Sequence, residues 1–117
     1  AFVPQGFAQL GWQVHHDLES GIGDADVVYC LRVQTERQSG IVYPSVAEYH
    51  RRYGLTLGRL DSLAGQAVVM HPGPVNRGVE MSGEVLTDPR CLVETQVANG
   101  VWTRMAVIKT LHESRKG

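Results

Sequence analysis

Two short apolar runs are separated by segments with helical spacing of apolar residues. The first, Val27–Leu31, is apolar and rich in β-branched residues on both faces of a strand, and Ala67–Met70 is the second. Such runs are typical of strands in a buried parallel sheet. Because they alternate with helical patterns, the chain is predicted to be an α/β protein of three layers, with a parallel sheet flanked by helices.

Several helices are expected, and most have an identifiable start or stop. They cover residues 5–10, 17–23, 45–53 and 56–63. Gly11 ends the first and Asp17 caps the second, while Ser45 and Glu48 form a capping box at the start of the third. Residues 12–15 are a candidate short strand.

From about Cys91 onward the pattern is that of one long C-terminal helix. Its apolar residues recur at helical spacing, namely Val97, Val101, Met105, Ile108 and Leu111. Asn99-Gly100 would normally indicate a turn, but the apolar face keeps its phase across Gly100. Asp88-Pro89 is interpreted as an N-cap followed by proline at a first helical position.

The candidate chemistry lies in the loops that follow the two predicted strands. Arg32 and Gln34 follow the first strand, and His71-Pro72-Gly73-Pro74 follows the second. Parallel strands bring both loops to one sheet edge, where open α/β sheets bind ligands. A guanidinium can bind a carboxylate through two charge-assisted hydrogen bonds, an amide can assist it, and a rigid proline-glycine loop can present fixed carbonyls. Each assignment has a plainer alternative. Arg32 could be a solvated surface arginine, and the proline-glycine loop could simply connect a strand to a helix. His71 could be a structural hydrogen-bonding residue rather than a general base.

Composition excludes several other classes. A length of 117 residues fits one small domain, and a net charge of -1 argues against non-specific nucleic-acid binding. No apolar run approaches the roughly 20 residues that span a membrane. Cys30 and Cys91 lack zinc-site spacing, so we expect reduced thiols and a cytoplasmic setting. Neither a dinucleotide fingerprint nor a nucleophile elbow is present in the sequence.

Three motifs together resemble the aspartate carbamoyltransferase family, in that family's order and over essentially the whole chain. They are Arg32-Val33-Gln34-Thr35-Glu36-Arg37, the segment from His71 to Glu80, and the segment from Gln96 to Val107, and residues 43–56 look similar too. The sister ornithine carbamoyltransferases usually have His-Cys-Leu-Pro where this chain has His71-Pro72-Gly73-Pro74. The chain therefore resembles the C-terminal portion of the aspartate-binding domain, covering residues 1–117.

The resemblance implies a reaction in which the α-amine of L-aspartate attacks carbamoyl phosphate and phosphate leaves, on the route to pyrimidines. It implies that Arg32 and Gln34 bind L-aspartate, and that the backbone of Pro72-Gly73-Pro74 contacts the carbamoyl group. The resemblance also implies that Arg37 braces the closed, substrate-bound loop and that Arg77 steadies the region around Pro72-Gly73-Pro74. The resemblance implies neither a metal nor an organic cofactor, and it assigns no catalytic residue to this chain.

Much of the family pattern is absent from these residues, including the N-terminal domain that grips carbamoyl phosphate. We therefore expect the 117 residues alone to be inactive. In the family the C-terminal helix packs on the N-terminal domain, so the isolated chain is expected to expose an apolar face and to aggregate or be partly molten.

The resemblance also implies a homotrimer of catalytic chains, and it leaves a regulatory or dihydroorotase partner open. Two other interpretations stay open as well. One is a non-catalytic binding or assembly module with an aspartate-domain fold. The other is a carbamoyltransferase that accepts a different amine, against which the Arg32-Val33-Gln34 motif argues.

Overall fold

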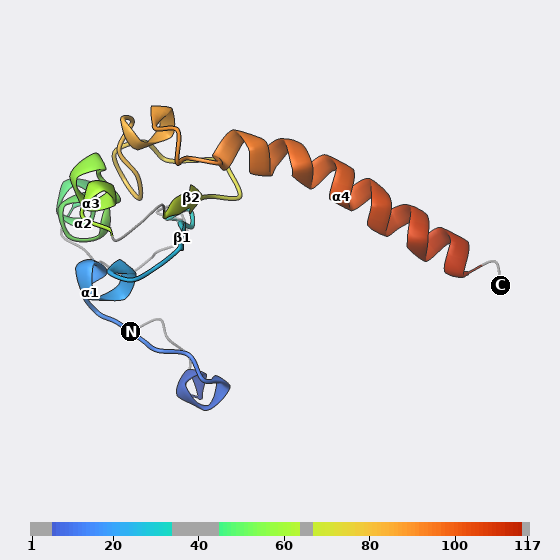
Figure 1. Cartoon of the computed structure of the whole chain (residues 1–117), viewed down its shortest axis with the longest axis horizontal. Coiled ribbons are helices and arrows are strands. Elements are labelled where there is room, and N and C mark those ends of the chain that lie inside the picture. The colour runs from blue at the N-terminus through green and yellow to red at the C-terminus, as the bar shows by residue number, and fades with distance from the viewer. Residues whose placement is uncertain (1–5, 34–44, 64–66, 116–117) are drawn as a thin grey trace.

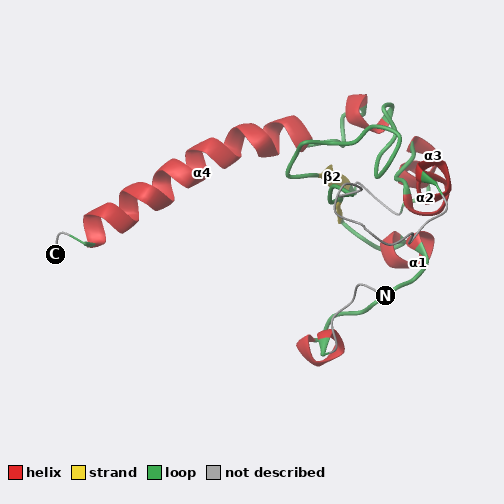
Figure 2. Ribbon diagram, turned by 180° about the vertical axis from the view of Figure 1, so that it is seen from behind, coloured by secondary structure: helices red, strands yellow, loops and turns green. Residues whose placement is uncertain are grey.

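The computed structural model describes residues 6–33, 45–63 and 67–115. Figure 1 shows the strand pair with helices α1, α2 and α3 to one side and α4 extending from the other, and Figure 2 shows the same arrangement from behind. In chain order the elements are the 3-10 helix η1 (Phe7–Leu10), α1 (Leu18–Ile22), β1 (Val27–Tyr29), α2 (Val46–Tyr53), α3 (Leu57–Asp61), β2 (Val68–Met70), the 3-10 helix η3 (Val85–Thr87) and α4 (Val93–Ser114).

The strands β1 and β2 pair in parallel, as predicted, with Val28 opposite Val69 in the register. These two valines are buried. The expected burial of both strand faces is wrong, because Val27 is 48% exposed and Tyr29 is 50% exposed. Within the described residues the sheet has two strands, so the outward face of β1 lacks the cover that a larger sheet and its helices would provide.

The core lies where the strand pair meets α3 and the connection between β2 and α4. It consists of Val28, Leu55, Leu60, Val69, Met81 and Val85. Leu55 and Met81 form an isolated parallel bridge, with Leu55 N donating to Glu80 O at 3.0 Å. This bridge fixes the segment around Glu80 beneath the strand pair.

The predicted helix starts are confirmed by their capping hydrogen bonds. Asp17 accepts a hydrogen bond from Ser20 N at 2.8 Å at the start of α1, and Ser45 accepts one from Glu48 N at 3.1 Å at the start of α2. Each of these bonds satisfies one amide that the first helical turn leaves without an intrahelical partner. The first helix is a 3-10 helix, and Gly11 follows it with φ +77°.

Helix α4 is continuous through Gly100, as predicted, and its first turns contact the strand pair, packing on β2 and donating from Gln96 Nε2 to Tyr29 Oη of β1 at 2.8 Å. Its apolar residues are largely exposed: Val97, Val101, Met105, Ile108 and Leu111 range from 48% to 68%. The expected exposure of this apolar face is therefore confirmed for the part of the chain that the structure describes.

Two predicted elements are wrong. Residues 12–15 form no strand. Asp88-Pro89 does not start a helix, since α4 begins at Val93 with Leu92 as its N-cap. Asp88 instead follows η3, and its carboxylate accepts hydrogen bonds from Arg90 N at 2.9 Å and Arg90 Nε at 2.8 Å. The arginine side chain thus occupies the oxygens that would otherwise cap a helix.

Candidate functional site

The loops that follow β1 and β2 lie against one another at the carboxyl edge of the strand pair. Cys30 N donates to Met70 O at 2.9 Å just beyond the paired residues. Farther along, Asn76 Nδ2 donates to Val33 O at 3.1 Å. The predicted meeting of the two loops is therefore confirmed for the described residues.

Arg32 is exposed at this edge. Gln34 and Arg37, the other predicted site residues of this loop, lie outside the described residues. The described part of the loop thus places the arginine, but not the amide, of the expected carboxylate site.

The His71–Pro74 loop is rigid and partly open to solvent. Pro72 and Pro74 are exposed, and Gly73 has φ +69°, a backbone conformation that residues with a Cβ rarely adopt. Together with the first turns of α4 the loop lines a shallow groove of about 590 Å³, whose α4 lining includes Val93 and Val97. The contact of this loop's backbone with the carbamoyl group stays a prediction.

His71 is a structural residue. Its side chain is completely buried, its Nδ1 accepts a hydrogen bond from Gly73 N at 2.8 Å, and its backbone N donates to Gln96 Oε1 at 2.9 Å. Its Nε2 lies 3.4 Å from Glu80 Oε1, but the two atoms form no hydrogen bond. A ring enclosed in this way holds the loop in shape and does not reach a ligand at the surface.

Arg77 is exposed and lines a hollow of about 460 Å³ together with Gly83, Thr87 and the start of α4. The chain turns just after it, at Gly78, which has φ +74°. The bracing role of Arg77 stays a prediction.

Two residues of the site, Glu80 and Asn76, were missed by sequence reasoning. Glu80 is 4% exposed, and its carboxylate accepts hydrogen bonds from Asn76 N at 2.6 Å and from Val33 N at 3.5 Å. The one available signal was an acidic residue between Val79 and Met81 inside a recognised motif. Nothing in the sequence pairs it with Val33, which is 47 residues away.

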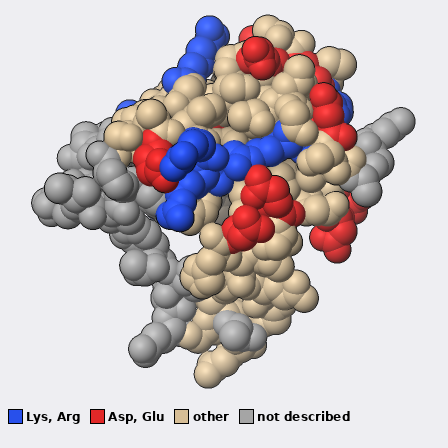
Figure 3. Space-filling model, turned by 90° about the vertical axis from the view of Figure 1, so that its left-hand side faces the viewer, with Lys and Arg blue, Asp and Glu red and all other residues tan. Residues whose placement is uncertain are grey.

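Figure 3 shows the face formed by the α1, α2 and α3 side of the molecule, where a band of basic side chains has acidic side chains beside it. Arg59 pairs with Glu19 at 2.8 Å, Arg90 pairs with Asp61 at 2.6 Å, and Arg51 pairs with Glu48. Since these cations have acidic partners, this face offers a polyanion little uncompensated positive charge.

Cysteine and metal chemistry find little support in the described residues. Burial raises the pKa of the Cys30 thiol to about 11, with the nearby Glu80 adding to the effect, so it stays protonated near neutral pH. Within residues 6–33, 45–63 and 67–115 no three His, Cys, Asp or Glu side chains gather as a metal site would require. The helices of that same part of the chain are too short or too polar to cross a bilayer.

The strand pair and its two loops define an α/β domain with a candidate ligand site at the carboxyl ends of parallel strands. Residues 7–111 match the family described as "Aspartate/ornithine carbamoyltransferase, Asp/Orn binding domain". The chain belongs to this family.

Similar proteins cover the chain but extend well beyond it. The aspartate carbamoyltransferase catalytic subunit of Sinorhizobium medicae is 48% identical over 109 residues, which are 93% of this chain and 35% of that protein. The Rhizobium etli subunit is 49% identical over 93% of this chain and 34% of its own length. The chain thus spans about a third of the relatives that it matches.

Solved structures of two kinds of carbamoyltransferase share the fold. Ornithine carbamoyltransferase from Thermus thermophilus aligns with a TM-score of 0.74 at 22% identity, over 93% of this chain and 35% of that one. Aspartate transcarbamoylase from Trypanosoma cruzi, in complex with carbamoyl aspartate and phosphate, aligns at 0.65 and 30% identity, over 80% and 28%. The first likeness supports the fold alone.

Proposed function

We propose that this chain supplies the L-aspartate side of an aspartate carbamoyltransferase site. In that reaction the α-amine of L-aspartate attacks the carbonyl carbon of carbamoyl phosphate. A C–N bond forms, the C–O bond to phosphate breaks, the amine loses a proton, and N-carbamoyl-aspartate and phosphate leave. The observation that carries the proposal is that the segment after β1, which holds Arg32, meets the loop after β2, which holds His71–Pro74, at one strand edge, with Asn76 Nδ2 3.1 Å from Val33 O.

Each site residue has a role that suits its chemistry. Arg32 would bind a carboxylate of L-aspartate through its planar fork of donors, with Gln34 adding an amide. The carbonyls of Pro72-Gly73-Pro74 would accept hydrogen bonds from the carbamoyl amide and the attacking amine. Arg37 and Arg77 would brace the surrounding loops. Catalysis would come from orientation and electrostatic stabilisation rather than from a metal or organic cofactor.

Aspartate is the proposed amine rather than ornithine. L-aspartate has two carboxylates, so an exposed arginine at the strand edge suits it, whereas ornithine has a cationic side chain that the same arginine would repel. Support also comes from relatives at 46–49% identity that are called aspartate carbamoyltransferase catalytic subunits. The pathway role that follows is de novo pyrimidine synthesis, in the cytoplasm.

The remaining parts of the site would come from residues outside this chain. We place residues 1–117 as the C-terminal portion of an aspartate-binding domain in a longer catalytic chain that forms a homotrimer, with a regulatory or dihydroorotase partner left open. The exposed apolar face of α4 favours a second candidate, a non-catalytic assembly module. The intact mass of the native polypeptide separates the two: a mass well above 12.9 kDa supports the catalytic chain, and a mass near it supports the module.

The test of the aspartate role is the variant Arg32→Gln in the complete polypeptide that its gene encodes. Losing a charge-assisted carboxylate contact should raise the KM for L-aspartate by about a hundredfold, and leave the KM for carbamoyl phosphate near its parent value. Arg115→Gln is the matched control, because Arg115 is exposed at the far end of α4. An unchanged aspartate KM in folded Arg32→Gln would count against the assignment.

A further inference from the structure

Glu80 is a buried carboxylate that joins the two loops of the site. Its Oε1 accepts from Asn76 N at 2.6 Å and lies 3.4 Å from His71 Nε2, while its Oε2 accepts a longer bond from Val33 N at 3.5 Å. A buried carboxylate is costly unless donors surround it. Its two hydrogen-bond donors, Asn76 N and Val33 N, come from the loop after β2 and from the segment after β1, so both segments must keep their places around Glu80.

Asn76 completes the attachment at the other backbone polar group of Val33. Its Nδ2 donates to Val33 O at 3.1 Å, so side chains from the 76–80 segment engage both backbone polar groups of Val33. The backbone ladder holds the preceding residues, since Cys30 N donates to Met70 O at 2.9 Å. At Val33, three residues beyond Cys30, the described bonds to the backbone come from the side chains of Glu80 and Asn76.

We propose that Glu80 and Asn76 are positioning residues for amine-substrate binding: by clamping the backbone of Val33 they set the direction in which the chain leaves β1. Val33 stands between Arg32 and Gln34, the two residues assigned to L-aspartate. A fixed peptide at Val33 holds Arg32 in place before the ligand arrives and reduces the ordering cost of binding. This role rests on the proposed function, and it adds two residues that do not touch the substrate themselves.

Isosteric substitutions break the clamp on one side at a time. In Glu80→Gln the amide can keep its oxygen toward Asn76 N, but its NH₂ group then faces the N–H of Val33 as a second donor. In Asn76→Asp a carboxylate oxygen replaces the Nδ2 donor and repels Val33 O. Both changes leave side-chain volume nearly constant, which limits packing effects.

The experiment measures saturation with L-aspartate and with carbamoyl phosphate for both variants in the complete polypeptide. Each variant is expected to raise the KM for L-aspartate by about tenfold and to leave the KM for carbamoyl phosphate within about twofold. A merely structural role would lower the melting temperature and leave the aspartate KM unmoved. Glu84→Gln is the matched control, because Glu84 is exposed and makes no capping bond to η3.

Amide hydrogen exchange at residues 31–33 provides a readout that does not depend on catalysis. Exchange there should be faster in Glu80→Gln and Asn76→Asp than in the parent or the control. If Glu80→Gln does not fold, Asn76→Asp decides the question, because Asn76 is only partly buried.

The two proposals fail in different ways. An active parent whose variants both keep the parental aspartate KM overturns the positioning role alone. A parent that makes no carbamoyl-aspartate overturns the proposed function, and the positioning role with it, whatever the exchange data show.

Discussion

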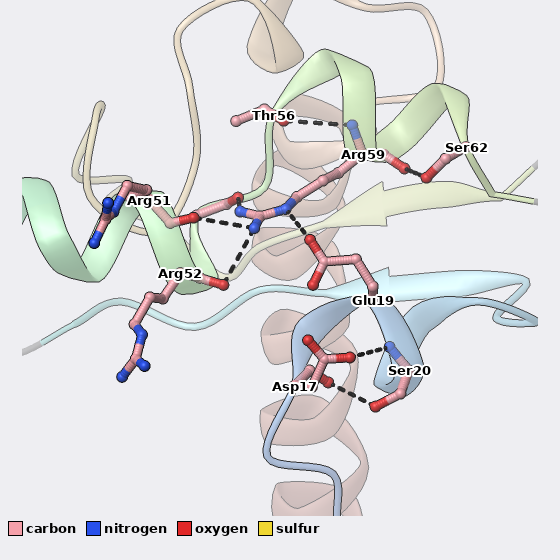
Figure 4. Close-up of polar contacts among 9 residues, drawn as sticks. Asp17, Glu19, Ser20, Arg51, Arg52, Thr56, Arg59 and Ser62 are labelled. Atoms are coloured by element: carbon pink, nitrogen blue, oxygen red, sulfur yellow. Dashed lines mark hydrogen bonds and ion pairs between the residues drawn. The ribbon is translucent and has the colours of Figure 1, made fainter.

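Arg59 holds the C-terminus of α2 against α1 and α3, and removing its guanidinium should loosen that end of the helix. Figure 4 shows the guanidinium directed at the last turn of α2. Its Nη1 donates to Gly54 O at 2.6 Å, its Nη2 donates to Arg51 O at 3.0 Å and to Arg52 O at 3.3 Å, and its Nε pairs with Glu19 at 2.8 Å. These are carbonyls that a helix end leaves without intrahelical partners.

The expected cost of Arg59→Met follows from these contacts. The side chain is 18% exposed, so its bonds are largely shielded from water, and a hydrogen bond to a charged group contributes about 1.5–3 kcal/mol. Water can solvate some of the freed carbonyls, so the bonds do not add, and we expect a loss of about 2 kcal/mol in the local opening free energy of α2. That corresponds to roughly thirtyfold faster amide exchange near Gly54 N, which donates to His50 O.

The assay is amide hydrogen exchange of residues 46–54 in the complete polypeptide. Arg52→Met is the matched control, because its side chain is 62% exposed and lies 3.7 Å from Glu48. Glu19→Gln should have a small effect, since Glu19 is 53% exposed and exposed ion pairs contribute about 0.2–1 kcal/mol. Exchange in Arg59→Met as slow as in Arg52→Met would refute the reasoning.

The remaining predictions concern the site loop, α4 and pH. Gly73→Ala should destabilise the loop by about 1–2 kcal/mol, because φ is +69° and a Cβ would lie 3.4 Å from Val97 Cγ2; an unchanged melting curve would contradict this. The 117-residue chain alone should associate through α4, and Ile108→Lys should shift its sedimentation toward the monomer, whereas a monodisperse parent would count against that. The hydrogen bonds from Arg90 lower the pKa of Asp88 from 3.8 to about 2, so Asp88 stabilises the fold above pH 3.8 and loses that effect as pH falls toward 2. Asp88→Asn should flatten acid denaturation over this window, and a variant with the parental pH profile would refute the assignment.

Local signals predicted the elements that depend on nearby residues. The Asp17 and Ser45 caps act within three residues, and the apolar phase that crosses Gly100 is a property of one helix. The parallel pairing of Val27–Tyr29 with Val68–Met70 followed from apolar runs separated by helical segments. The caps and the helical phase were predictable because the interactions behind them are short-ranged in sequence, whereas the pairing followed from the rule that strands alternating with helices form a parallel sheet.

The features that sequence did not predict depend on distant partners or on missing cover. The attachment of Val33 to Glu80 spans 47 residues, and no periodicity encodes it. Asp88 was mistaken for a helix N-cap because the competing donor, Arg90, lies beyond the proline. Val27 and Tyr29 were expected to be buried because their composition suits a covered strand, whereas the described chain leaves them about half exposed.

The central claim is tested most directly by an amine competition assay on the complete polypeptide that its gene encodes. The protein receives carbamoyl phosphate with equal concentrations of L-aspartate and L-ornithine, and mass spectrometry measures the two carbamoylated products. The account predicts carbamoyl-aspartate in large excess, and its loss in Arg32→Gln. Carbamoylated ornithine as the main product, or no product from a folded protein, would contradict it.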